Sequence, residues 1–263
     1  MPILGKHLFP LYIKSLCTNW AFRCMRAAGI KTVSHNLACG GKMILDTNDR
    51  LALRICCERG FEPVVRREIE RIASRGVNVI DIGANIGYYT ILTSKLVGPD
   101  KRVYAFEPQP HVLNKLRANI EANGLLNVTV FPLALSDKAG TVPFHIPTEG
   151  SEAHGSIHAN GRFEVMKIVD VETQRLDDVL SRLGSPEIGF IKMDAEGAEL
   201  AILRGAVRLL SGPNRPILVF EANEDNCQPF GHCVYDLLQF VRSFGYRLRQ
   251  LDKEDWLAVP EPV

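Results

Sequence analysis

The sequence lacks several features that would assign it to a membrane or nucleic-acid-binding class. No apolar run approaches the roughly 20 residues that a membrane-spanning helix needs, because charged residues interrupt each one early. The N-terminus does not show the basic start, continuous apolar run and small-residue cleavage site of a signal peptide. Lysine and arginine number 31 against 30 aspartate and glutamate, a formal net charge of +1. This balance argues against nucleic acid as the partner.

The sequence also lacks the paired Cys-x-x-Cys spacing of a zinc site. Its seven cysteines are an odd number in a chain of 263 residues, which is long enough for one large packed domain. We therefore expect free thiols and a cytoplasmic protein rather than a disulfide-built one. Cys227, His232 and Cys233 lie close together in the sequence, but without the paired spacing we expect no metal.

The most informative segment is residues 77–90, which read VNVIDIGANIGYYT. An apolar run ends at Asp81 and glycines follow at once, which predicts the turn from a buried strand into a helix. Such a turn presents free amides to a ligand, and Gly83 and Gly87 let the ligand approach closely. A dinucleotide fold needs Gly-x-Gly-x-x-Gly, but Asn85 occupies the position of the middle glycine. The segment therefore predicts a cofactor site that does not cradle a pyrophosphate.

From residue 77 onward, apolar strand patterns and helix patterns alternate, which argues for a parallel sheet covered on both faces. Residues 246–251 and 256–259 are expected to close this sheet as an antiparallel pair. The other predicted strands are residues 102–106, 128–135, 141–146, 165–172, 188–194 and 216–221, and the predicted helices include 110–123, 198–210 and 235–244. Residues 148–161 have no clear period, and a loop of that length tends to be a lid or a binding loop.

The N-terminal part, residues 1–60, is expected to be a helical and hairpin extension, followed by the main domain at 61–263. Residues 8–30 mix apolar and basic positions, and we expect a helix that packs on its own domain. The alternative is an amphipathic helix that makes weak peripheral contact with a membrane. Residues 35–55 are expected to be extended, and Pro63 is expected to begin a helix.

Two further positions carry charge where predicted strands end. Glu107 ends the next strand, about 20 to 25 residues beyond Gly83, where a carboxylate can accept hydrogen bonds from both hydroxyls of a ribose. Lys192 and Asp194 lie two residues apart in a predicted strand and so project to the same face. Charges at the end of an apolar strand are costly unless they are paired or used. A structural ion pair is the alternative interpretation of Lys192 and Asp194.

The motifs taken together resemble a known enzyme family. In chain order they are DIGANIGYYT, VYAFEPQP, VTVFPLALSDKAGTVPF, TQRLDDVL, IKMDAEGAELAILRGA and ILVFEAN. Over about residues 60–223 the chain resembles the FkbM family of class I methyltransferases. The resemblance implies a Rossmann-like α/β fold, with a seven-stranded, mostly parallel sheet and an antiparallel C-terminal strand. It also implies S-adenosylmethionine as the cofactor. Family members with known substrates largely methylate hydroxyls on sugars, on glycolipid or lipo-oligosaccharide head groups, or on polyketide-type natural products.

The resemblance and the turn together define candidate site residues. Ser136 and Asp137 follow the third predicted strand, where class I methyltransferases bind adenine; a plain turn is the alternative interpretation. The candidate cofactor-binding residues are Asp81, Gly83, Ala84, Asn85, Gly87, Tyr89, Glu107, Pro108, Ser136 and Asp137. The candidate catalytic residues are Asp194 as base or orienting group, Lys192 as its partner, and Glu221 in reserve. Glu196 and His154 are the candidate acceptor-binding residues.

The sequence therefore predicts an O-methyltransferase that acts on a small-molecule, glycan or glycolipid acceptor. Methylation of a small-molecule or protein amine stays open. A nucleic-acid methyltransferase is disfavoured because the Asn/Asp-Pro-Pro-aromatic turn of amino methylation is absent after the predicted strand 188–194. A non-catalytic module that only binds the cofactor is the remaining alternative, although Gly83, Gly87 and Glu107 are all present.

Overall fold

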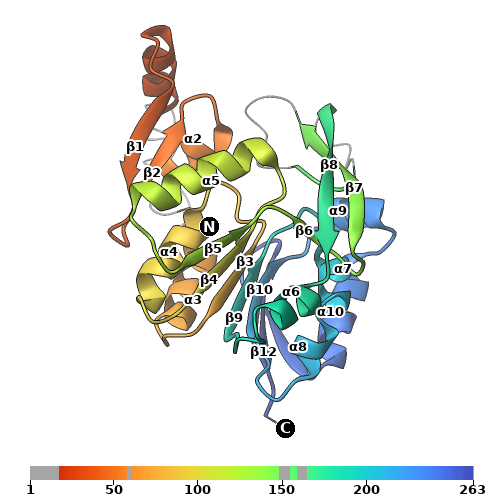
Figure 1. The fold of residues 1–263 in the computed structure, drawn as a ribbon. Helices are drawn as coiled ribbons and strands as arrows, with labels where there is room; N and C mark the ends of the chain where they lie inside the picture. The colour runs from red at the N-terminus through yellow and green to blue at the C-terminus, as the bar shows by residue number, and fades with distance from the viewer. Residues whose placement is uncertain (1–17, 58–60, 148–154, 159–164, 263) are drawn as a thin grey trace, which may run out of the picture.

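A computed structural model describes residues 18–57, 61–147, 155–158 and 165–262 (Figure 1). Its centre is a seven-stranded sheet in the order β5-β4-β3-β9-β10-β12-β11. These strands are β5 (Val128–Phe131), β4 (Val103–Phe106), β3 (Val79–Ile82), β9 (Phe190–Met193), β10 (Ile217–Glu221), β12 (Asp255–Pro260) and β11 (Tyr246–Gln250). The pairs from β5 to β10 are parallel, and β12 runs antiparallel to both of its neighbours. The predicted sheet, with its antiparallel C-terminal strand, is confirmed.

The strand order creates a place for a ligand. From β3 the chain proceeds outward to β4 and β5, and it then returns to the other side of β3 to form β9 and β10. Ligands of open α/β sheets bind at such a change of direction, beyond the carboxyl ends of the strands. The glycine turn after β3 lies at this point.

Side chains of the sheet alternate between two apolar cores, because successive residues of a strand point to opposite faces. Ile80 and Ile191 join one core, whereas Val79 and Phe190 join the other. The first core is covered by α6 (Leu176–Arg182), α7 (Glu199–Arg204), α8 (Val207–Ser211) and α10 (Val234–Ser243). The second is covered by α3 (Pro63–Ala73) and α4 (Tyr88–Val97). Two short elements, α9 (Glu224–Cys227) and the 3-10 helix η2 (Gln228–Phe230), follow β10, and α5 (Pro110–Ala122) packs with β4 and β5.

A second sheet, of three strands, corrects one predicted element. It consists of β6 (Ala134–Leu135), β8 (Val165–Gln174) and β7 (Gly140–Pro147). The predicted strand 128–135 is therefore wrong beyond Phe131, because the chain leaves the main sheet there. Pro132 has no N–H to donate to the ladder, so the strand stops and Ala134 pairs with β8 instead.

The N-terminal part packs directly on the main domain. Residues 18–27 are helical, and a hairpin of β1 (Thr32–Asn36) and β2 (Lys42–Asp46) follows. The prediction of extended structure to residue 55 is wrong from Arg50 onward, because α2 (Arg50–Cys57) begins where the Asp49 carboxylate accepts a hydrogen bond from Leu51 N at 2.8 Å.

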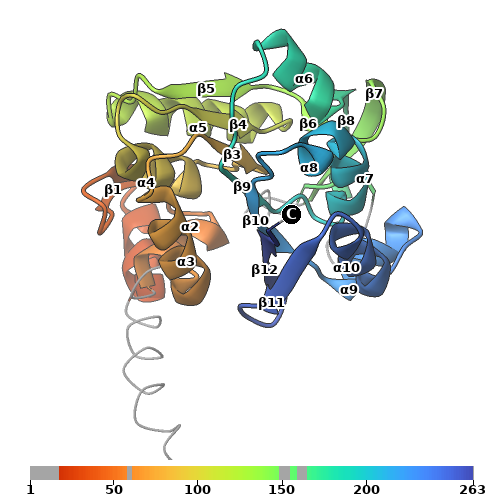
Figure 2. The same cartoon turned by 90° about the horizontal axis from the view of Figure 1, so that it is seen from below.

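Side chains of this N-terminal part complete one of the two cores. Phe22, Met43, Leu45 and Ile55 are buried in the core that α3 and α4 cover, and Figure 2 shows α2 beside these helices. Residues 1–17 lie outside the described part, as does much of the predicted helix at 8–30. No helix in the described part of the chain is long and apolar enough to cross a membrane.

Candidate active site

A cavity of about 400 Å³ opens at the carboxyl ends of the parallel strands. Its wall is built by the glycine turn, the ends of β4, β9 and β10, the turn between β11 and β12, and residues of α2. The lining residues include Arg50, Arg54, Phe61, Glu62, Gly83, Ala84, Asn85, Tyr88, Tyr89, Glu107, Pro108, Gln109, Leu135, Phe144, Ile157, Lys192, Asp194, Glu196, Glu221 and Asp255. This volume lies within the usual range for a small-molecule or cofactor site.

The glycines of the turn are required first by the chain's own packing. Gly83 has φ +71°, and a Cβ atom there would lie 1.8 Å from the carbonyl oxygen of Asp194. Gly87 has φ +95°, and a Cβ atom would lie 2.7 Å from Leu116 Cδ1. Glycine thus lets the end of β9 and a side chain of α5 approach the turn. Gly83 also lines the cavity, whereas Gly87 begins α4 behind the wall.

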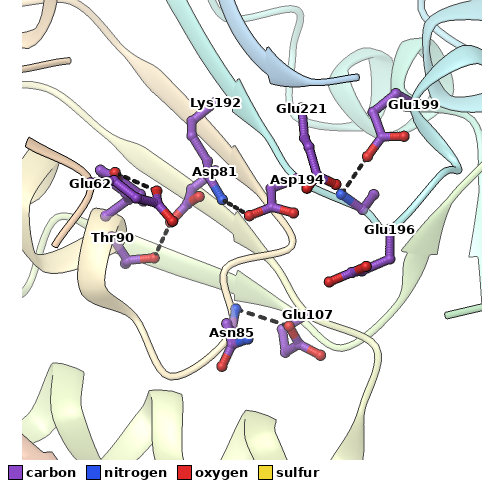
Figure 3. Close-up of polar contacts among 12 residues, drawn as sticks. Glu62, Asp81, Asn85, Thr90, Glu107, Lys192, Asp194, Glu196, Glu199 and Glu221 are labelled. Atoms are coloured by element: carbon purple, nitrogen blue, oxygen red, sulfur yellow. Dashed lines mark hydrogen bonds and ion pairs between the residues drawn. The ribbon is translucent and has the colours of Figure 1, made fainter. Parts of the chain in front are cut away.

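Glu107 is held in a fixed orientation at the end of β4. Its Oε2 accepts a hydrogen bond from Asn85 N at 2.9 Å (Figure 3). Its Oε1 accepts one from Gln109 N, also at 2.9 Å. Burial raises the pKa of Glu107 to about 7, although these two amide donors oppose the shift. The carboxylate therefore faces the cavity with acceptor capacity left for a ligand's hydroxyl groups.

Asp81, a predicted cofactor residue, lies beneath the wall rather than in it. It is 1% exposed, and its Oδ2 accepts a hydrogen bond from Thr90 Oγ1 at 2.6 Å. Its Oδ1 has no hydrogen-bond partner in the structure as described. Burial raises the pKa of Asp81, and the Lys192 ammonium and the Thr90 hydroxyl oppose that rise. Asp81 thus interacts electrostatically with the Lys192 ammonium from behind the cavity wall.

The Lys192 and Asp194 side chains do project to the same side of β9. Lys192 Nζ lies 3.3 Å from Asp194 Oδ2 and 5.2 Å from the centroid of the Tyr89 ring. Burial lowers the pKa of Lys192, but the carboxylates of Asp194, Asp81 and Glu62 outweigh it and raise the pKa. The ammonium therefore stays charged. The Asp194 side chain is 41% exposed, whereas that of Lys192 is 8% exposed, so Asp194 is the accessible partner.

Beyond Asp194 the cavity wall contains the carboxyl groups of Glu196 and Glu221, which accept hydrogen bonds from the same side chain, Asn226. Asn226 Nδ2 donates to Glu196 Oε2 at 2.9 Å and to Glu221 Oε2 at 3.2 Å. Burial raises the pKa of Glu221 to about 10, and the neighbouring carboxylates of Asp194, Glu196 and Glu199 add to the shift. Glu221 is therefore harder to ionise than an ordinary glutamate side chain.

The adenine-side candidates lie elsewhere than the sequence pattern suggested. Ser136 and Asp137 follow β6 and are not lining residues, whereas Leu133, Ala134 and Leu135 line the cavity. The cause is the early end of β5, which moves this segment into the second sheet. His154 lies outside the described residues.

Sequence reasoning missed several polar residues in the wall, among them Arg54, Glu62, Gln109 and Asp255. Gln109 is 2% exposed, and its Nε2 has no hydrogen-bond partner within the described structure. Burial raises the pKa of Asp255 to about 7, with Glu62 and Asp194 contributing. The segment Gly60-Phe61-Glu62-Pro63, which leads into α3 ahead of the glycine turn, was the available signal for Glu62.

Comparison with known proteins assigns the domain. Residues 81–248 match the family model described as the methyltransferase FkbM domain. The chain belongs to this family. It is 32% identical over 154 residues to the methyltransferase sdnD of Sordaria araneosa, covering 48% of this chain and 59% of that protein. It is 32% identical over 146 residues to the 2-O-methyltransferase NoeI of Sinorhizobium fredii, covering 51% and 58%. It is 30% identical over 172 residues to the hexuronic acid methyltransferase AglP of Haloferax volcanii, covering 64% and 65%.

These matches span only about three-fifths of the relatives' length. S-adenosylmethionine is the cofactor of the FkbM-family domain at residues 81–248. The cavity suits an adenosine-containing molecule, because Glu107 is pre-oriented for ribose hydroxyls. The partnerless amide of the adjacent Gln109 also fits, since a buried donor without a partner is costly until a ligand satisfies it.

Proposed function

We propose that this FkbM-family domain is an O-methyltransferase that transfers a methyl group to a hydroxyl of a sugar, a glycan or glycolipid head group, or a natural product. The observation that carries the proposal is the accessible Asp194 carboxylate in the cavity wall, paired with the buried Lys192 ammonium. A carboxylate in this place can orient an acceptor hydroxyl and take its proton.

The chemistry requires little beyond alignment and proton removal. S-adenosylmethionine supplies a methyl group that its sulfonium has already activated. The residues of the chain must then hold the acceptor oxygen in line with that methyl group. Lys192 Nζ donates to Asp194 Oδ2 at 3.3 Å and so keeps the carboxylate in place. The carboxyl groups of Glu221 and Glu196, both held by Asn226, offer hydrogen-bonding partners to further polar groups of the acceptor.

The names of two relatives support the acceptor class. NoeI is named a 2-O-methyltransferase and AglP a hexuronic acid methyltransferase. We propose a comparable polyhydroxylated acceptor for this chain. Mass spectrometry of the glycolipid and metabolite pools, with and without the chain, should reveal one molecule that gains a single methyl group. If no hydroxyl group gained a methyl group and an amine did, the chain would be an N-methyltransferase instead.

Replacing Asp194 by asparagine tests the catalytic role. Asp194→Asn keeps the shape but removes the base, so we expect turnover to fall about 100-fold or more while the affinity for S-adenosylhomocysteine stays nearly constant. Steady-state kinetics and calorimetry measure the two quantities. Asp100→Asn, in an exposed turn, is the matched control. Wild-type turnover in Asp194→Asn would leave Asp194 and Lys192 as a structural ion pair.

The proposal also includes a cytoplasmic location and weak contact with a membrane surface. Cys24, Cys39, Cys227 and Cys233 carry free thiols, which supports a cytoplasmic setting. Weak membrane contact through residues 8–30 would suit a glycolipid acceptor. Sedimentation with lipid vesicles tests that contact.

A further inference from the structure

Glu62 has a backbone conformation that its sequence context disfavours. Its φ is 46° and its ψ is 67°, in the left-handed region, although it is not glycine. It also precedes Pro63, and a residue before proline prefers extended backbone. Strained residues of this kind tend to lie at functional sites, where the surrounding structure compensates their cost. Here the strain accompanies a carboxylate in the cavity wall.

The Glu62 carboxylate lies between two fixed partners. Tyr89 Oη donates to Glu62 Oε2 at 2.9 Å, and Arg54 Nη2 lies 3.5 Å from Glu62 Oε1. The Arg54 guanidinium in turn lies over the Phe61 ring, 4.9 Å from its centroid. Arg54, Phe61, Glu62 and Tyr89 all line the cavity. The wall therefore presents one oriented anion and one oriented cation next to each other.

Glu62 and Arg54 lie away from Glu107, the residue expected to bind the ribose. Figure 3 shows Glu62 on the Lys192 side of the glycine turn and Glu107 on the other side, with Asn85 between them. If the ribose of a ligand contacts Glu107 and the ligand crosses the glycine turn, its other end extends toward Glu62. S-adenosylmethionine carries an α-amino and an α-carboxylate group at that end.

The charge pattern matches such a zwitterion. The other cation nearby, Lys192, is already paired with Asp194, whereas Arg54 is 48% exposed and its long contact with Glu62 leaves donors for a carboxylate. Burial raises the pKa of Glu62, and Asp194 adds to that rise, so an incoming ammonium would relieve an unfavourable negative charge.

We propose that Glu62 and Arg54 bind the methionine end of the cofactor, with the Glu62 carboxylate accepting from its ammonium and the Arg54 guanidinium donating to its carboxylate. The inference rests on S-adenosylmethionine occupying this cavity. It assigns a binding role to the segment before the glycine turn, which no motif of the turn itself contains.

Two ligands that differ only at the methionine end test this inference by calorimetry. S-adenosylhomocysteine has the amino-acid end, whereas 5′-methylthioadenosine keeps the adenosine and the sulfur but lacks the charged groups. We expect Glu62→Gln and Arg54→Gln each to lower the affinity for S-adenosylhomocysteine about 10-fold or more, and to leave the affinity for methylthioadenosine within about twofold. Glu70→Gln, which removes the carboxylate of an ion pair with Arg66 on α3, is the control and should change neither.

The outcomes are distinct. An equal loss for both ligands would mean that the variants distort the cavity, and it would overturn the assignment. Unchanged binding of S-adenosylhomocysteine by both variants would overturn it too. If the wild-type chain bound neither ligand, the proposed function would fail together with this inference. Arg54→Gln keeps the test valid if Glu62→Gln does not fold, because Arg54 lies on the surface of α2.

Discussion

At the residue scale, Gly83 links the glycine turn to the end of β9. Its Cα lies so close to the end of β9 that an added Cβ would overlap the Asp194 carbonyl oxygen. The same glycine lines the cavity. One position therefore sets both the path of the turn and the place of Asp194.

Gly83→Ala should be strongly destabilising. The added methyl group meets backbone 1.8 Å away at a left-handed φ of +71°, so we expect a loss of at least about 3 kcal/mol in the free energy of unfolding. Gly231 is the matched control, since it has a φ of +75° and a ψ of 24° in the left-handed region, with nothing within 4 Å of an added Cβ. Gly231→Ala should cost only about 1 to 2 kcal/mol, from backbone strain alone. Chemical denaturation measures both, and equal losses would refute the packing explanation.

At the scale of elements, the N-terminal hairpin is attached to α5 by asparagine side chains. Asn119 Oδ1 accepts from Ile44 N at 2.7 Å, and its Nδ2 donates to Ile86 O at 2.8 Å. Asn123 Oδ1 accepts from Lys42 N at 2.8 Å. Asn119 thus joins β2, α5 and the glycine turn through one buried amide. This contact fixes the region that leads into α2, and α2 carries Arg50 and Arg54 into the cavity wall.

Removing the Asn119 amide should loosen this attachment. Asn119 is 0% exposed, so Asn119→Ala leaves the part-buried N–H of Ile44 and the buried C=O of Ile86 unpaired, and it should cost about 2 to 4 kcal/mol in the free energy of unfolding. Asn123→Ala breaks more exposed contacts and should cost less than about 1 kcal/mol. Denaturant unfolding gives both values. A loss at Asn119 no larger than at Asn123 would contradict this view.

At the scale of the whole molecule, the site concentrates carboxyl groups that the fold makes hard to ionise. Burial raises the pKa of Glu107 to about 7 and that of Glu199 to about 8, from an ordinary value of 4.5. The folded chain therefore binds these protons more tightly than the unfolded chain does. Their contribution to stability is complete below about pH 4.5 and is lost as the pH rises through about 7 to 8.

Glu199→Gln should flatten this dependence. Glu199 is 1% exposed and accepts a hydrogen bond from Ala195 N at 2.7 Å, which the glutamine oxygen can also accept. We expect the variant to gain on the order of 3 kcal/mol over the wild type at pH 9, and little at pH 5. Unfolding curves at several pH values measure the difference. Glu121→Gln, on the exposed side of α5, should show no such gain, and a pH-independent effect at Glu199 would refute the explanation.

Much of the fold was predictable because its signals are local. Alternating apolar strand and helix patterns predicted the parallel sheet, and the glycine turn with Glu107 predicted which end of it binds a ligand. The sequence pattern failed where pairing depends on distant partners. It extended the strand after α5 through residue 135, and it did not separate the second sheet, because the partner of Ala134 lies about 40 residues later in β8.

The sequence by itself determined the family, the cofactor class and the positions of Glu107, Lys192 and Asp194 at strand ends. Only the tertiary structure decided which residues share one wall. It buried Asp81 behind the cavity wall, placed Glu221 where burial makes its carboxyl hard to ionise, and brought Arg54 and Glu62 from the N-terminal part to the same cavity as Asp194. The physical reason is that burial and charge proximity depend on contacts between distant segments, whereas a motif records only neighbours along the chain.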